Sequence, residues 1–293
     1  MSRVVQPVAD RGVGETAVVE TVPDVVVDLF GLLTHLGDPV TLLVIVAAGY
    51  LLADHLDVSR TRMAAAIGFA LGGVALTLAL KHAFALPRPP GAGTDGFGFP
   101  SGHAIGATVV YGSLAGLLAD RRPFLTRAAA VLIVVVAASR VVIGVHYLVD
   151  VFVGIAVGVG YLALAFRLGP GWAPDRVTAD AAGRTFALAV GVALAALAVT
   201  VVLDTVIAVA GAIGGWLGWR FAADRIATTT GSTSQLVLSL VVLPAVAVVG
   251  STVVEGDVSL SLAAVLTGGI VAVLMAVPGV AALRSPTESR SSG

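Results

Sequence analysis

The chain has 293 residues, of which 57% are hydrophobic and 12% are charged, and its formal net charge at pH 7 is −1. Soluble proteins carry about 25% charged residues, so this chain has too little polar surface for a soluble globule, and its mean hydropathy is +1.00. The small net charge gives no reason to expect nucleic acid as a partner. The absence of cysteine excludes disulfides, thiolate metal sites and cysteine nucleophiles. The composition predicts an all-α integral membrane protein.

The N-terminal part of the chain differs from the rest in polarity. Residues 1–22 mix acidic and basic residues without an apolar core, so we expect no signal peptide here. The stretch 24–36 is apolar but short and polar at three positions, which indicates an interfacial or re-entrant helix. It precedes a break at Gly37-Asp38-Pro39.

Apolar stretches near the length of a membrane-spanning helix, about 20 residues, then follow one another. The expected spans are 39–54, 62–83, 102–119, 124–143, 147–167, 184–203, 204–221, 234–252 and 259–282. They predict a polytopic helical bundle with a core of about six helices, one of them possibly interfacial, and an additional C-terminal helical region. The predicted segments are a flexible N-terminus (1–23), a membrane-embedded core (24–168), a cytoplasmic linker (169–183), a C-terminal transmembrane extension (184–282) and a flexible tail (283–293).

One apolar run is too long for a single span. The 39 residues between Arg127 and Arg167 would cross a bilayer nearly twice, so the chain must turn back, and Gly144 is the expected turn. We expect Ser139-Arg140 to end one helix and His146 to begin the next. In the extension, the glycines and tryptophans of "AGAIGGWLGWR" (210–220) predict tight helix packing with interfacial anchors. A lipid path is the alternative for that segment.

Arginine placement predicts the orientation. Arginines gather in or beside the connections 55–61, 120–127 and 168–184, which should therefore be cytoplasmic. The alternating connections 84–101 and 139–147 should then face outside, together with the N-terminus.

The two external connections hold three polar clusters. They are "KHAFALPRPP" with Lys81 and Arg88, "PSGH" with Ser101, Gly102 and His103, and "SRVVIGVHYLVD" with Arg140, His146 and Asp150. Each cluster alone has a structural explanation: snorkelling basic residues, a serine N-cap, a satisfied buried histidine, or a polar knot between helices. However, Lys81 is the single lysine among seventeen basic residues, whereas a generic membrane anchor would more naturally be another arginine.

Together the clusters indicate a phosphate site. Three cations at one place repel each other unless an anion lies between them, and arginine and lysine match phosphate oxygens. A helix starting at Ser101 adds N–H donors and a favourable dipole. Gly102 would let an oxyanion approach the backbone closely.

The histidines supply the chemistry in this interpretation. His146 and Asp150 are four residues apart, so on a helix they would share one face. Asp150 can then accept the Nδ1–H of His146, which leaves Nε2 as a nucleophile. His103 has no such carboxylate partner nearby in the sequence and suits the general acid. Below Asp150, Gly154 and Gly158 predict close approach of a neighbouring helix.

The three motifs, Lys-x6-Arg-Pro, Pro-Ser-Gly-His and Ser-Arg-x5-His-x3-Asp, resemble those of the type 2 phosphatidic acid phosphatase family, the membrane branch of the superfamily that includes vanadium haloperoxidases. The resemblance covers about residues 24–168 and not 184–282. It implies that His146 forms a phosphohistidine supported by Asp150 and that His103 protonates the leaving group. It also implies that Lys81, Arg88, Ser101, Gly102 and Arg140 hold the phosphoryl oxygens, with neither metal nor cofactor. The implied partners are the bilayer and a membrane lipid phosphate, such as phosphatidic acid, phosphatidylglycerol phosphate or a polyprenyl pyrophosphate.

Other functions stay open at this point. Phosphotransfer to an acceptor other than water uses the same phosphohistidine, so the motifs do not separate it from hydrolysis. A non-enzymatic transport or lipid-binding protein with a relic site is a further alternative, which the additional C-terminal spans keep open. A haloperoxidase is disfavoured because those relatives are soluble. A serine-protease reading with Ser101 as nucleophile leaves Lys81, Arg88 and Arg140 unexplained.

Overall fold

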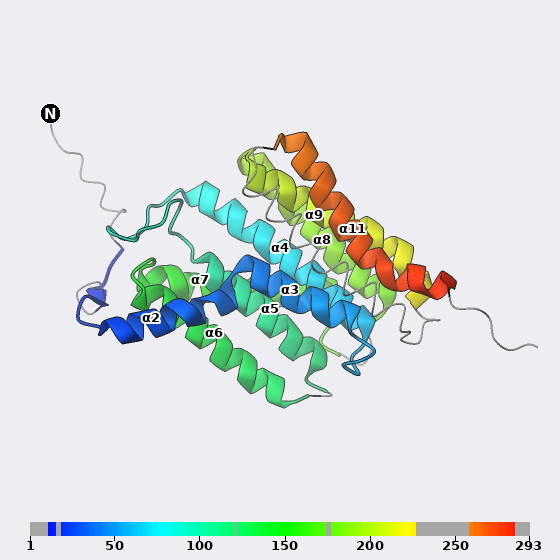
Figure 1. Cartoon of the computed structure of the whole chain (residues 1–293), viewed down its shortest axis with the longest axis horizontal. Coiled ribbons are helices and arrows are strands. Elements are labelled where there is room, and N and C mark those ends of the chain that lie inside the picture. Colours follow the sequence, from blue (N-terminus) through cyan, green and yellow to red (C-terminus); the bar gives the residue numbers. More distant parts are fainter. Residues whose placement is uncertain (1–10, 16–18, 121, 174–176, 227–257, 285–293) are drawn as a thin grey trace, which may run out of the picture.

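The computed structural model describes residues 11–15, 19–120, 122–173, 177–226 and 258–284. The span expected at 234–252 and most of the N-terminal and C-terminal segments expected to be flexible lie outside the described residues. Within the described part the chain is all-α (Figure 1). The helices are α2 (Asp24–Leu33), the 3₁₀ helix η1 (Thr34–Gly37), α3 (Pro39–Leu51), α4 (Arg60–Phe84), α5 (Gly102–Leu118), α6 (Phe124–Val142), α7 (Leu148–Leu168), α8 (Ala179–Val199), α9 (Leu203–Ile226) and α11 (Leu260–Arg284).

The helices have the length and surface of a membrane bundle. Six of those in the described residues are long and apolar enough to cross a bilayer: α4, α6, α7, α8, α9 and α11. The break expected at Gly37-Asp38-Pro39 is present, and the two helical stretches on either side of it meet at an angle of 49°. Large apolar side chains such as Val134 of α6 and Phe152 of α7 are more than half exposed, which suits contact with lipid chains rather than water. The protein is a multi-pass membrane helical bundle.

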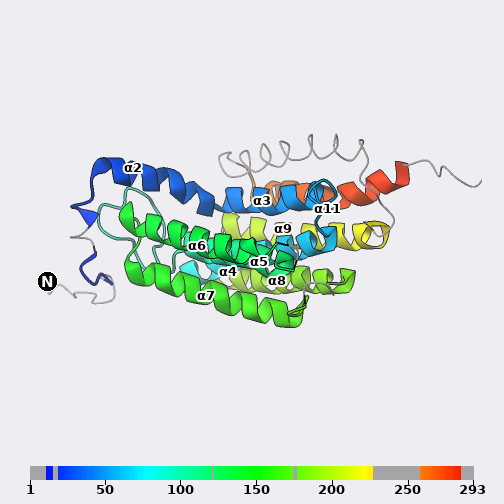
Figure 2. The ribbon, with the colours of Figure 1, turned by 90° about the horizontal axis from the view of Figure 1, so that it is seen from below.

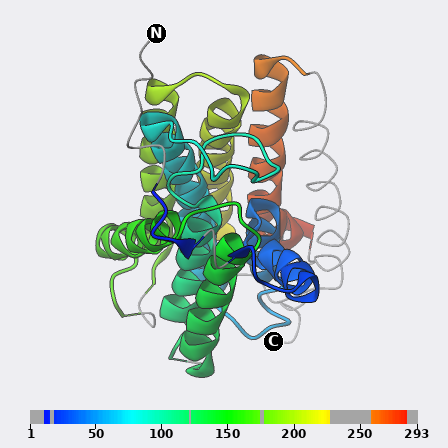
Figure 3. The ribbon, with the colours of Figure 1, turned by 90° about the vertical axis from the view of Figure 1, so that its left-hand side faces the viewer.

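α4 lies in the middle of this bundle, packed against α3, α5, α8 and α9 (Figures 1 and 3). Glycines on α4 allow the close approach of α8. A Cβ atom at Gly68 would collide with Thr185, and one at Gly72 would lie 3.3 Å from the Cα atom of Ala189. The C-terminal helices therefore complete the packing of α4. The division of the chain at residues 168 and 184 stays a prediction.

α9 and α11 also pack closely through glycine. The tight contacts are at Gly214 and Gly218, where an added Cβ atom would collide with the main chain of α11. One expectation for this segment is wrong: Trp219 is not an interfacial anchor. It is 1% exposed and donates from Nε1 to the carbonyl of Ala179 at 3.0 Å, because α8 covers it.

The turn between α6 and α7 is at the expected place but differs in detail. Gly144 has a φ of +73°, a conformation that glycine adopts without strain. α6 continues to Val142 instead of ending at Ser139-Arg140, and α7 begins at Leu148, so His146 precedes the helix rather than beginning it. The carbonyl of Arg140 accepts from the backbone N–H of His146 at 3.2 Å. This bond places the imidazole beside the end of α6.

α5 and α7 pack as the glycine stripe predicts. A Cβ atom at Gly154 would lie 2.8 Å from the carbonyl oxygen of Ser101, and one at Gly158 would lie 2.7 Å from the Cβ atom of Thr108. The absence of side chains at these positions lets α7 bring Asp150 next to the start of α5, where the backbone N–H of Ser101 donates to the carbonyl of Asp150 at 3.0 Å.

This packing gives a first prediction. Gly154→Ala should destabilise the protein by about 1–3 kcal/mol, the usual cost of forcing an extra methyl group into a packed contact, because the added carbon meets main chain that cannot rotate away. Gly160→Ala is the matched control on the same helix, since nothing lies within 4 Å of its added carbon. Thermal unfolding in detergent should show a lower midpoint for the first variant and an unchanged or higher one for the second. Equal midpoints would show that α5 and α7 do not pack this closely.

The connections sort to the two ends of the bundle as expected. The α4–α5 and α6–α7 connections lie at one end together with residues 11–15 (Figure 2). At the other end Arg122 donates to the carbonyl of Leu56 at 2.7 Å, and Arg62 forms a two-pronged ion pair with Asp120 at 2.7 and 2.8 Å. Arg62 is buried. At least one of the arginines used to predict the orientation therefore also has a structural role in helix packing.

Candidate active site

The three sequence motifs meet at one end of the bundle. The start of α5 contacts α7 through the Ser101–Asp150 backbone bond, and Arg88 donates from Nη1 to the carbonyl of Val145 at 3.2 Å. An added Cβ atom at Gly102 would lie 3.4 Å from Cε of Lys81. All eight residues predicted from the sequence lie in this region: His146, His103, Asp150, Lys81, Arg88, Ser101, Gly102 and Arg140.

The contacts of His146 define its tautomer. Nη1 of Arg88 lies 3.2 Å from Nε2 of His146, and a guanidinium only donates hydrogen bonds. Nε2 must therefore accept, which leaves the proton on Nδ1. Nδ1 lies 3.5 Å from Oδ2 of Asp150, longer than an ordinary hydrogen bond. Burial, together with the charges of Arg88, Lys81 and Arg140, lowers the pKa of His146 to about 4, whereas Asp150 acts in the opposite direction. At neutral pH the ring is uncharged and its Nε2 lone pair is available.

Besides Nδ1 of His146 and Nη1 of Arg11, two polar atoms at the site are buried without a hydrogen-bond partner among the described residues. They are Oγ of Ser101 and Nε of Arg140. Ser101 occupies the N-cap position of α5, but its side chain makes no capping bond, so capping alone does not explain the serine. Nη1 of Arg140 donates to Oγ1 of Thr34 at 2.6 Å, which fixes the guanidinium. Buried donors without partners are costly, and the oxygens of a bound anion would satisfy both.

The other two cations rest on carbonyl oxygens of the α4–α5 connection. Nζ of Lys81 donates to the carbonyl of Phe97 at 2.9 Å, and Nε of Arg88 donates to the carbonyl of Asp95 at 3.2 Å. Neither contact neutralises its cation. The charges of both, and that of Arg140, act on the imidazole of His146, so the four groups share one electrostatic environment.

His103 has a carboxylate partner that the sequence analysis did not identify. Its Nε2 lies 2.8 Å from Oδ1 of Asp38, and Oδ2 of Asp38 contacts Nδ1 of His35 at 2.7 Å. Gly37 allows this approach, because an added Cβ atom there would lie 3.2 Å from the ring of His103 and would collide with Val136. The break at Gly37-Asp38-Pro39 was visible in the sequence, but nothing local links it to His103, which is 65 residues away.

Asp150 also has partners beyond His146. The backbone N–H of Tyr147 donates to its Oδ2 at 3.0 Å, and Nε of Arg11 donates to its Oδ1 at 2.8 Å. The carboxylate, whose side chain is fully buried, is thereby held by a main-chain donor and a cation. Arg11 was not predicted, since it lies in the segment expected to be flexible.

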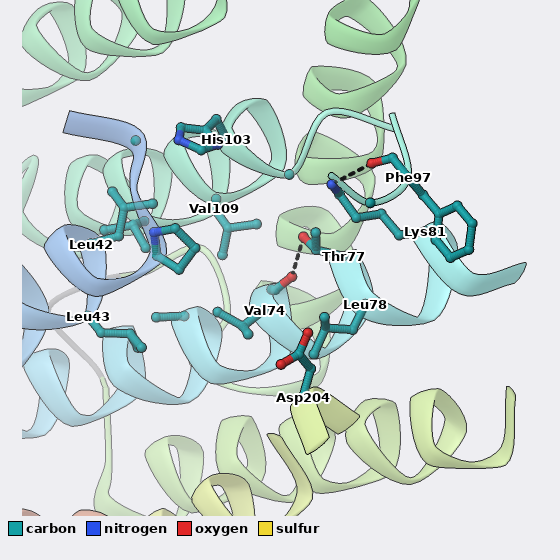
Figure 4. Close-up of a pocket in the computed structure, with 18 of the residues that line it drawn as sticks. Leu42, Leu43, Val74, Thr77, Leu78, Lys81, Phe97, His103, Val109 and Asp204 are labelled. Carbon is teal, nitrogen blue, oxygen red and sulfur yellow. Dashed lines mark hydrogen bonds between the residues drawn. The ribbon is translucent and has the colours of Figure 1, made fainter. Parts of the chain in front are cut away.

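A cavity of about 380 Å³ opens onto five of the eight predicted residues, whereas Ser101, Arg140 and Asp150 are not among the described residues that line it. Lys81, Arg88, Gly102, His103 and His146 line its polar end. Figure 4 shows Leu42 and Leu43 on the side opposite Lys81, with Val74 and Val109 between them, and Asp204 of α9 at the rim. The cavity thus joins a cationic end to an apolar region between α3, α4 and α5. No group of three or more His, Asp or Glu side chains among the described residues is placed to bind a metal ion.

Comparisons with known proteins match the segment of the chain that carries the three motifs. Residues 62–173 match the PAP2 superfamily model, a segment that includes all three motifs. The chain is 41% identical over 69 residues to phosphatidylglycerophosphatase B of Bacillus subtilis (strain 168), a match that covers 21% of this chain and 34% of that relative. The chain therefore matches about a third of that protein's length.

Among solved structures, the chain is similar to the crystal structure of a transmembrane PAP2-type phosphatidylglycerolphosphate phosphatase from Bacillus subtilis. The identity is 28%, the match covers 51% of this chain and 79% of that one, and the TM-score is 0.43. The family match over residues 62–173 confirms the resemblance seen in the sequence: this segment, which carries all three motifs, is similar to the PAP2 superfamily.

Proposed function

We propose that this protein is a membrane lipid phosphatase that hydrolyses a phosphomonoester or a pyrophosphate of a lipid through a phosphohistidine on His146. The observation that carries the proposal is a set of buried donors without hydrogen-bond partners and of three cations without an ion-pair contact, among the described residues, around a neutral imidazole. Oγ of Ser101 and Nε of Arg140 lack partners, and the pKa of His146 is lowered to about 4 by burial and by cations. A phosphoryl group supplies the negative oxygens that these groups lack.

In the first half of the proposed reaction, the phosphoryl oxygens bind to Lys81, Arg88, Ser101, Arg140 and the N–H groups at the start of α5, including Gly102. Arg88, which now donates to Nε2 of His146, transfers that donor to a phosphoryl oxygen as phosphorus approaches. The Nε2 lone pair forms the bond to phosphorus and the bond to the leaving oxygen breaks. Asp150 stabilises the positive charge that develops on the ring.

His103 handles the proton in both halves. The cycle starts with His103 as the imidazolium, paired with the carboxylate of Asp38 at 2.8 Å. It donates its proton to the leaving oxygen, and the neutral ring then takes a proton from the water that attacks phosphorus, which restores the imidazolium. The second attack breaks the bond from phosphorus to nitrogen, releases phosphate and restores neutral His146. The cations stabilise the charge of both transition states, so the proposed reaction uses neither a metal ion nor a cofactor.

The position of the site supports a lipid substrate. The cavity runs from the cationic end into an apolar region between transmembrane helices, so a phosphate headgroup and part of a chain can lie in it together. A similar protein of Bacillus subtilis is named phosphatidylglycerophosphatase B, and phosphatidic acid and polyprenyl pyrophosphates offer the same terminal phosphate. Arginine placement in the sequence supports an active site on the extracytoplasmic side of the cell membrane.

A phosphate-release assay tests the proposal. Purified protein in detergent micelles, given phosphatidylglycerol phosphate, phosphatidic acid or a polyprenyl pyrophosphate, should release inorganic phosphate from at least one, at a rate that a metal chelator does not change. The same assay with added glycerol or another alcohol reports on the alternative, since a transferase would form a new phosphate ester in place of free phosphate. Folded protein that binds these lipids without turnover would support a relic site and contradict the proposal.

A further inference from the structure

Residues 11–15 lie over the end of α7 that carries Asp150, and Arg11 is inserted into the site. Its Nε donates to Oδ1 of Asp150 at 2.8 Å, and its Nη2 donates to Oδ2 of Asp150 at 3.2 Å and to the carbonyl of Pro87 at 2.9 Å. The guanidinium also lies 5.5 Å from the ring centre of Phe99 and 5.0 Å from that of Tyr147. With a side chain only 10% exposed, Arg11 is an internal residue of this end of the bundle.

The same segment has a second attachment. Oε1 of Glu15 accepts from the backbone N–H of Leu148 at 2.8 Å. Leu148 is the first residue of α7, so its N–H has no partner within the helix, and a carboxylate there also complements the helix dipole. Two charged side chains of the N-terminal segment thus contact the start of α7.

Arg11 matters for the charge balance of Asp150. A fully buried carboxylate needs a cation beside it. His146 does not serve as that cation, because its lowered pKa leaves the ring neutral at neutral pH. Arg11 provides the charge, and it occupies Oδ1 so that Oδ2, also held by the N–H of Tyr147 at 3.0 Å, faces Nδ1 of His146.

We propose that Arg11 is a positioning residue of the active site, acting as the counter-ion that holds the carboxylate of Asp150 toward His146 while the imidazole stays neutral. This inference rests on the proposed role of His146 as the nucleophile. Asp150 has two ion-pair contacts within 4 Å among the described residues, one with Arg11 and one with the imidazole of His146. If Arg11 is removed, the imidazole is the partner that remains. Asp150 would then draw a proton onto His146, and a protonated ring has no lone pair on Nε2 with which to attack phosphorus.

Several other groups act on the same ring and set the background for this effect. They are Asp150 of α7, Arg88 of the α4–α5 connection, Lys81 of α4 and Arg140 of α6. His146 in turn acts on His103 of α5. The three cations favour the neutral ring and Asp150 favours the charged one. Removing Arg11 therefore changes the balance through Asp150, and the effect should vanish when Asp150 is itself made neutral.

A histidine titration tests this without relying on turnover. The protein has five histidines, and ¹³C-labelled histidine spectra between pH 4 and 8, with the His146 signal assigned from His146→Gln, follow the ring directly. In the wild type His146 should stay neutral down to about pH 5. In Arg11→Gln it should titrate at least about one pH unit higher, as expected when a carboxylate loses its other counter-ion. Arg11→Lys, which keeps the charge, should restore most of the wild-type behaviour.

Two comparisons make the test specific. Arg122→Gln removes an arginine that donates to a main-chain carbonyl at the opposite end of the bundle, and it should leave the His146 titration unchanged. In an Asp150→Asn background, Arg11→Gln should have no further effect. An unchanged titration in Arg11→Gln, or an equal shift with and without Asp150, would overturn the proposal for Arg11.

The activity assay then separates the two proposals. With phosphatidylglycerol phosphate, Arg11→Gln should lower kcat by about twofold or more at pH 5, where a rise of one unit from a pKa of about 4 leaves about half of the rings protonated. At pH 8 kcat should be nearly unchanged, and KM should be nearly unchanged at both pH values, because it is the charge state of the nucleophile that changes. If the wild type releases no phosphate but the titration shift is present, the proposed function fails and the counter-ion role stands. A uniform loss of kcat at every pH would instead indicate a structural role only.

Discussion

His146→Gln is expected to lower kcat for lipid phosphate hydrolysis by about 10⁴-fold or more, the scale on which removal of a catalytic nucleophile acts. Glutamine keeps a polar side chain of similar size in the turn that follows Gly144, so the helices beside it should remain folded. It has no nitrogen lone pair comparable to that of a neutral imidazole, and no phosphorus–nitrogen bond can form. The measurement is phosphate release under saturating substrate, with thermal unfolding to confirm that the variant is folded.

A trapping experiment gives the same prediction a second readout. Wild-type protein quenched during turnover of a ³²P-labelled lipid phosphate should carry label that is stable to base and lost in acid, as expected of a phosphohistidine, and His146→Gln should carry none. His55→Gln is the matched control, because His55 is an exposed residue of the α3–α4 connection at the opposite end of the bundle. Turnover by His146→Gln above about 1% of the wild-type rate would rule out attack by this nitrogen.

His103→Gln should lower kcat by about 10²–10⁴-fold on a lipid phosphate, the range for loss of a general acid. The loss should depend on the leaving group. An alkoxide leaves poorly without a proton, whereas p-nitrophenolate leaves readily without one, so the variant should be much less impaired on a p-nitrophenyl phosphate substrate. The ratio of the two losses measures how much of the effect of His103 is proton donation.

Asp38→Asn tests the same proton transfer through the carboxylate partner of His103. Asp38 contacts Nε2 of His103 at 2.8 Å but is not among the residues that line the cavity. Asp38→Asn should therefore cause a smaller loss than His103→Gln, with the same dependence on the leaving group. Equal losses on both substrates for His103→Gln would mean that the ring contributes to binding instead of proton transfer.

The helices, and the motifs that meet at one end of the bundle, could be predicted because both depend on local sequence. The expected span 62–83 corresponds to α4 at Arg60–Phe84, since bilayer thickness fixes the length of an apolar run. The residue spacing within each motif is read directly from the sequence. Gly144 marks the turn after which α7 runs back beside α5. Predictions from local sequence failed where packing between distant helices decides the outcome. Trp219, expected at the membrane interface, is instead buried under α8.

The carboxylate partner of His103 and the counter-ion of Asp150 could not be predicted. Asp38 is 65 residues from His103, and Arg11 is 139 residues from Asp150, so no helical periodicity connects either pair. The position of His146 relative to α7 also could not be predicted from the spacing of His146 and Asp150. An i, i+4 spacing suggests a shared helix face, but α7 starts two residues after His146, and the 3.5 Å contact with Asp150 arises from the turn.

The glycines of α4 have a consequence for how much of the chain forms an independent protein. Gly68 and Gly72 face α8, and Thr185 lies where a side chain at Gly68 would be, with its Oγ1 3.4 Å from the carbonyl of Ala65. A chain cut after residue 173, where the family match ends, would leave this side of α4 as an uncovered groove of bare backbone on the helix that carries Lys81. The smallest part of the chain that keeps α4 packed on this side, and with it Lys81 in place, therefore extends at least through α8, beyond the segment that matches the family model.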